Sequence, residues 1–64
     1  MGFMEAQALK RGDMVLLGHK PLKVLAKRSL RHGKNSGRHG GEILLTDYNW
    51  HGWWEIGRME GMEN

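Results

Sequence analysis

The sequence contains no cysteine, a single proline and no long apolar run. Without cysteine the chain has neither disulfides nor thiolate zinc ligands, which suits a reducing compartment. No apolar segment approaches the roughly 18–20 residues that cross a bilayer, and the first residues lack the apolar core of a secretory signal. These absences predict a soluble, cytoplasmic protein with no membrane partner.

The chain has only 64 residues, which predicts one small domain. A domain of about 60 residues buries only roughly 60% of the surface that its unfolded chain exposes. Domains of this size commonly depend on disulfides, a metal ion, oligomerisation or unusually good packing. Since disulfides are excluded, association with a partner is one alternative, and a homo-oligomer is another.

Acidic residues are absent from the whole stretch between Asp13 and Glu42. That stretch holds seven of the ten basic residues, and the remainder of the chain holds all seven acidic ones. The seven basic residues are Lys20, Lys23, Lys27, Arg28, Arg31, Lys34 and Arg38. Such an asymmetry indicates the kind of partner rather than the fold, and a polyanion is the natural candidate.

Four runs of strand length are separated by turn signals: residues 13–17, 22–26, 42–48 and 53–56. The sequence GHKP joins the first two runs and NWHG joins the last two, so each pair reads as a β-hairpin. The first residues have helical propensity. Residues 1–8 are therefore predicted to form an N-terminal extension or a short helix.

The order of these runs predicts an all-β domain over residues 9–57, a small SH3-like antiparallel barrel of four to five strands. A long basic loop between strands 2 and 3, residues 30–41, has four glycines and no periodicity, which disfavours regular structure. Residues 58–64 are predicted to be a flexible C-terminal tail. A fifth strand could come from the N-terminal residues, from residues 58–62 or from a neighbouring subunit that covers an open edge.

The segment LKRGDMV (residues 9–15) resembles the start of the first strand in SH3-like barrels of the KOW type. Residues 9–56 resemble the N-terminal domain of bacterial elongation factor P and of its eukaryotic hypusine-containing counterpart. In that family a turn with Gly and Pro, here GHKP, precedes the second strand, and a glycine-flanked basic tip, here SGRHG, precedes the third. The resemblance implies a role in translation with RNA or the ribosome as partner, and it puts Arg38 at the position of the family's modified basic residue. The segment RHGK (residues 31–34) adds a second basic turn to that tip.

The chemistry of the basic loop suits phosphate. Arginine presents a planar fork of donors, lysine acts as a point charge, and glycine lets backbone amides approach a ligand closely. The predicted nucleic-acid-binding residues are Lys27, Arg28, Arg31, His32, Lys34, Arg38 and His39. The plainer alternative is a solvated loop whose charges serve solubility only.

Three tryptophans lie within five residues, in the segment WHGWW (residues 50–54). Adjacent side chains of a strand point to opposite faces, so Trp53 and Trp54 cannot both face one core. Both can still pack, one inside the barrel and one beneath the N-terminal segment. The functional alternatives are a platform that stacks unpaired bases or an anchor at an interface, with Tyr48, Trp50 and Trp54 as the candidates.

Catalysis and metal binding have little support in the sequence. The histidines of the loop have arginine and lysine as neighbours, whose charge opposes a bound dication, so no metal site and no cofactor are predicted. Serine and threonine occur without a nucleophile elbow or a Walker loop. We therefore predict that the protein is not an enzyme.

Two functions remain open. The leading prediction is a small non-enzymatic module that binds nucleic acid, with RNA or the ribosome favoured over DNA. The alternative is a protein-interaction module, an adaptor or inhibitor of the kind that phages and mobile elements encode. Such a module would dock on an acidic partner protein through the basic loop and the tryptophan cluster.

Overall fold

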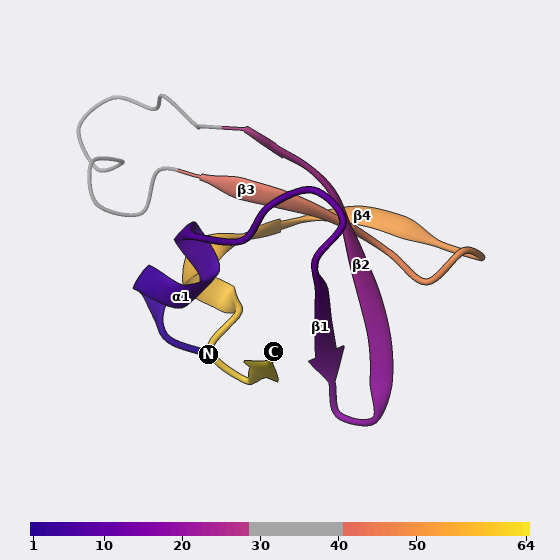
Figure 1. The fold of residues 1–64 in the computed structure, drawn as a ribbon, viewed down its shortest axis with the longest axis horizontal. Helices are drawn as coiled ribbons and strands as arrows, with labels where there is room; N and C mark the ends of the chain where they lie inside the picture. Colours follow the sequence, from indigo (N-terminus) through magenta and orange to yellow (C-terminus); the bar gives the residue numbers. More distant parts are fainter. Residues whose placement is uncertain (29–40) are drawn as a thin grey trace.

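The computed structural model describes residues 1–28 and 41–64, and Figure 1 shows how their elements are arranged. The strands are β1 (Met14–Leu17), β2 (Lys20–Arg28), β3 (Glu42–Thr46), β4 (His51–Glu55) and β5 (Met62–Glu63). A short helix, α1 (Phe3–Gln7), precedes them, and a 3-10 turn, η1 (Ile56–Arg58), lies between β4 and β5. The predicted all-β class is confirmed.

All five strands belong to one antiparallel sheet with the order β4-β3-β2-β1-β5. The C-terminal strand adds to β1 and does not pair with β4. A closed barrel would need the two outermost strands to pair, so over the described residues the sheet is open. These residues therefore do not form the closed barrel that was predicted.

One face of the sheet carries the core. Along each strand, the residues that face the core alternate with residues that point away from it, as the two-residue period of a β-strand requires. Helix α1 and the C-terminal segment lie against this face (Figure 1). The buried core residues are Ala6, Leu9, Val15, Leu22, Val24, Ile43, Leu45, Ile56, Met59 and Met62. The core therefore extends at both ends beyond the predicted domain of residues 9–57.

A β-bulge in β2 changes which side chains face the core. The pairing with β3 shifts register between Val24 and Ala26, which leaves Leu25 as the extra residue. Such an insertion reverses the facing of every later residue on the strand. As a result Lys27 points to the core side, and Arg28 points to the opposite side, which we call the outer face.

The C-terminal residues 58–64 differ from the predicted flexible tail. Met59 and Met62 are fully buried, and β5 joins the sheet beside β1. The amino group of Met1 donates hydrogen bonds to the carbonyl oxygens of Glu60 (2.9 Å) and Met62 (2.6 Å). The two ends of the chain are thus tied together, and this segment completes the core.

The turn between β3 and β4 begins earlier than predicted. β3 ends at Thr46 and β4 begins at His51, whereas the predicted strands covered residues 42–48 and 53–56. Asp47 ends the strand because its side chain accepts backbone N–H groups of the turn that follows. A short polar side chain that bonds the local backbone favours a turn over a continued strand.

Candidate nucleic-acid interface

Only two of the seven predicted nucleic-acid-binding residues, Lys27 and Arg28, belong to the described part of the chain. The other five lie outside it: Arg31, His32, Lys34, Arg38 and His39. The residues that flank their segment, residues 29–40, are nevertheless fixed by the sheet. Arg28 pairs with Glu42 in the β2–β3 ladder, so the segment begins and ends at the same end of this hairpin (Figure 1).

Arg28 contacts two side chains on the outer face. Its Cζ lies 3.9 Å from the centroid of the Trp53 ring, which is a cation–π distance. Its Nε donates to Oε1 of Glu42 at 2.7 Å, and its Nη2 lies 2.7 Å from the same oxygen. The side chain of Arg28 is still 52% exposed. A phosphate that approaches Arg28 would have to compete with the Glu42 carboxylate.

Lys27 has a different partner on the core side of the sheet. Its ammonium group donates to the carbonyl oxygen of Gln7, the last residue of α1. The C-terminal end of a helix has carbonyl groups without intrahelical partners, which attract a cation. Lys27 therefore fastens α1 to β2, and this contact gives it a structural role.

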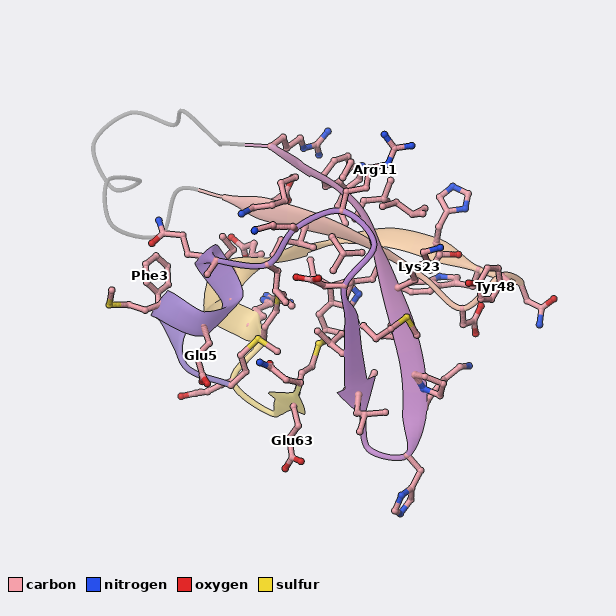
Figure 2. All side chains as sticks on the ribbon, viewed as in Figure 1. Phe3, Glu5, Arg11, Lys23, Tyr48 and Glu63 are labelled. Atoms are coloured by element: carbon pink, nitrogen blue, oxygen red, sulfur yellow. The ribbon has the colours of Figure 1, made fainter. Side chains whose placement is uncertain are left out.

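The described residues include three cations that the predicted site left out. Neither an acidic side chain nor a hydrogen bond engages the side chains of Lys10, Arg11 and Lys23 within the described ranges. Lys23 pairs with Thr46 on the outer face, and Figure 2 shows Arg11 on the side of the sheet away from α1. Lys23 could have been identified from the sequence, because it alternates with the apolar residues on either side of it.

The aromatic residues of the predicted stacking site lie in different environments. Tyr48 and Trp50 are 77% and 47% exposed, whereas Trp54 packs against the core. Trp53, which the prediction omitted, is 37% exposed and lies on the outer face. Because side chains alternate along a strand, the adjacent residues Trp53 and Trp54 had to point to opposite faces of the sheet. The pairing of Trp54 with the buried Ile43 decides which one faces inwards.

An open groove of about 450 Å³ runs beside β4. Its lining residues are Glu42, Trp50, Trp53, Trp54, Glu55 and Arg58. Arg58 Nε lies 3.3 Å from Oε1 of Glu55. Two carboxylates oppose a phosphate group here, while the three indole rings favour an apolar or aromatic ligand.

The described residues offer little for other chemistry. No cluster of three or more His, Asp or Glu side chains in residues 1–28 and 41–64 has the arrangement of a metal site. The helices of these same ranges are too short and too polar to span a bilayer.

No protein-family model, no curated protein and no solved structure matches the chain.

Proposed function

We propose that this protein binds nucleic acid, with RNA favoured over DNA, through the basic segment of residues 28–38. One observation carries the proposal: Arg28 and Glu42 pair at the end of the β2–β3 ladder and hold both ends of the segment together. A loop of the length of residues 29–40, with its ends fixed side by side, reaches at most about 20 Å from that end. Its charges therefore act on one region of space, which is what the binding of a phosphate backbone requires.

The outer face supports the same proposal. Arg11 and Lys23 add cations without an acidic partner to this side of the sheet. The Trp53 ring lies on the same face of the sheet with Arg28 over it. Exposed aromatic rings next to basic groups are a common way to hold single-stranded nucleic acid, since bases stack and phosphates bind the cations.

The resemblance of residues 9–56 to the N-terminal domain of elongation factor P is the reason for favouring RNA or the ribosome. An antiparallel sheet of five strands is consistent with a small β-barrel-like fold of the KOW type. In this interpretation Arg38, at the position of the family's modified residue, is the main contact of the basic segment.

Binding of a labelled single-stranded RNA oligonucleotide by the full chain tests the proposal. We expect Arg31→Glu combined with Arg38→Glu to weaken binding roughly tenfold or more, because two phosphate contacts become repulsive. A matched control combines Lys10→Glu with Arg58→Glu, which changes the net charge equally at residues outside the basic segment. The lost Arg58–Glu55 pair is highly exposed, so this control should fold normally.

Circular dichroism and thermal unfolding would show that both double variants are folded. Equal weakening by the two double variants would mean that net charge alone drives association. An affinity that does not change in Arg31→Glu with Arg38→Glu, together with a flat response to salt, would overturn the proposal.

The groove beside β4 favours a second candidate function, a protein-interaction module. Its exposed indole rings are of the kind that anchor protein interfaces, although Glu42 and Glu55 make it unsuited to an acidic ligand. An acidic partner would instead contact the basic segment. A pull-down from lysate with and without nuclease separates the candidates: a stoichiometric complex that survives nuclease and is lost in Trp50→Ala supports the second function.

A further inference from the structure

β4 is an outermost strand of the sheet. Among the described residues it pairs with β3 only, in an uninterrupted register over all five of its residues. Natural edge strands usually avoid association through lysine, proline, bulges or short length. β5, at the other edge, has only two residues, whereas β4 has the sequence HGWWE, without lysine or proline. As far as the described residues show, the edge of β4 is therefore free to accept another strand.

The register with β3 determines which backbone groups of β4 remain available. The N–H of Asp47 donates to the carbonyl of Trp50 at one end, and the N–H of Ile56 donates to the carbonyl of Gly41 at the other. Hydrogen-bonded positions alternate along an antiparallel ladder. The residues between these ends that bond to β3 are consequently the even-numbered ones.

His51, Trp53 and Glu55 therefore direct their N–H and C=O groups away from the sheet. They lie at every second position, with equal spacing on either side of Trp53. When the β4 strands of two copies pair antiparallel with Trp53 at the centre, His51 of each copy lies opposite Glu55 of the other. The two Trp53 residues then lie opposite each other. This register gives every outward donor and acceptor a partner, whereas a shift by two residues leaves some of them unpaired.

We propose that two copies of this chain associate through their β4 edges, antiparallel and about a two-fold axis at Trp53. This self-association rests on the edge of β4 and not on the proposed nucleic-acid binding. The result is one continuous sheet across the axis, with the same surface used by both copies, as a two-fold symmetric interface requires.

The outer-face side chains are self-complementary in this register. The imidazole of His51 can donate an N–H to the Glu55 carboxylate of the second copy, whether the ring is neutral or charged. The two Trp53 residues face each other with their Cα atoms about 5.5 Å apart, a spacing at which offset stacking is favourable. Two identical copies of β4 can therefore supply both partners of every contact on the outer face.

The core-side face of β4 is complementary as well. Gly52 has no side chain, and it comes to lie opposite Trp54 of the second copy. The Trp50 ring already lies over Gly52, since a Cβ at this glycine would be only 2.7 Å from Cζ2 of Trp50. Trp54 of the second copy can therefore pack against Trp50, which is 47% exposed.

A second copy fits this edge better than the other possible occupants. A nucleic-acid strand would bring phosphates next to Glu42 and Glu55, which line the adjacent groove. An unrelated extended peptide can bond to the backbone groups, but nothing in the described residues selects its side chains. A second copy of β4 that runs in the opposite direction places a complementary side chain opposite each of His51, Trp53 and Glu55.

Analytical ultracentrifugation of the nuclease-treated full chain over a wide concentration range tests the proposal. We expect the average mass to rise from that of one chain to that of two. His51→Glu places like charges opposite each other at both ends of the paired strands and should weaken association roughly tenfold. His19→Glu, the same change in the β1–β2 turn, should leave association unchanged.

The combination of His51→Glu with Glu55→Lys restores opposite charges and should restore most of the association. Amide hydrogen exchange supplies a second measurement, in which His51, Trp53 and Glu55 gain protection at high concentration. The amides of Gly52 and Trp54 should be protected at every concentration, because they bond to β3. A single-chain mass at all concentrations would overturn the proposal, and so would a dimer in which those three amides gain no protection.

Discussion

At the scale of single residues, Asp47 organises the turn between β3 and β4. Its Oδ1 accepts the N–H groups of Asn49 (2.9 Å) and Trp50 (2.8 Å), and its Oδ2 lies 2.7 Å from Nζ of Lys20. The hydrogen bond from Lys20, followed by the bond from the Asn49 backbone, lowers the pKa of Asp47 below its usual 3.8. These contacts hold a turn in which Tyr48 has a φ of 78°, which is unfavourable for a residue with a side chain.

The lowered pKa of Asp47 predicts how stability depends on pH. Its contribution to the free energy of unfolding is present above the unfolded pKa and is lost as the pH falls through the lower folded pKa. We therefore expect Asp47→Asn to lower the Tm at neutral pH and to have little effect in strong acid. Thermal melts at both pH values measure this, and a Tm difference that is equal at the two pH values would contradict it.

Adjacent residues can have unrelated roles, as Lys27 and Arg28 show. Both were predicted to bind phosphate because they belong to one basic segment. The bulge at Leu25 directs Lys27 to α1 and Arg28 to the outer face, where Glu42 and Trp53 contact it. A bulge depends on the pairing of two strands, so the sequence of β2 alone does not reveal it.

At the scale of elements, the C-terminal segment is the largest difference between the predicted and the observed structure. GRMEGMEN is polar and rich in glycine, which is typical of a mobile tail. Its two methionines are nevertheless buried against the sheet, and the amino group of Met1 bonds to the carbonyls of Glu60 and Met62. Contacts with β1, with the core and with the N-terminus hold this segment in place.

A substitution in β5 tests this role of the C-terminal segment. Met62→Ala removes a fully buried side chain and should lower the free energy of unfolding by about 2–5 kcal/mol. The neighbouring change Glu63→Ala, on the exposed side of the same strand, should change it by less than about 0.5 kcal/mol. Urea titration of the two variants measures the difference, and equal stability would show that the segment does not contribute to the core.

At the scale of the whole molecule, the distribution of charge matters more than its total. The chain carries a formal net charge of +3, yet the stretch from Asp13 to Glu42 has seven cations and no acid between its ends. Three of the seven acids form ion pairs with basic residues of the sheet and of η1: Asp47 with Lys20, Glu42 with Arg28 and Glu55 with Arg58. The cations of the segment between β2 and β3 are thus the main basis of the proposed affinity for a polyanion.

The salt dependence of RNA binding provides a test at this scale. Each phosphate contact on single-stranded nucleic acid contributes about −0.7 to the slope of log K against log salt. If Arg31 and Arg38 each contact one phosphate, their joint replacement by glutamine should reduce that slope by about 1.4. Titrations at several salt concentrations measure the slope, and an unchanged slope would exclude both residues from the interface.

Much of this protein could be predicted from its sequence. The all-β class, the strands and turns, and the concentration of basic residues between β2 and β3 are local properties, because alternation, turn residues and charge are read within a few neighbouring positions. The tertiary structure decided that the C-terminal methionines complete the core, that Trp54 packs inwards while Trp53 faces out, and that β4 is left as an open edge. These features depend on contacts between residues far apart in the chain, and such contacts form only when the strands pair.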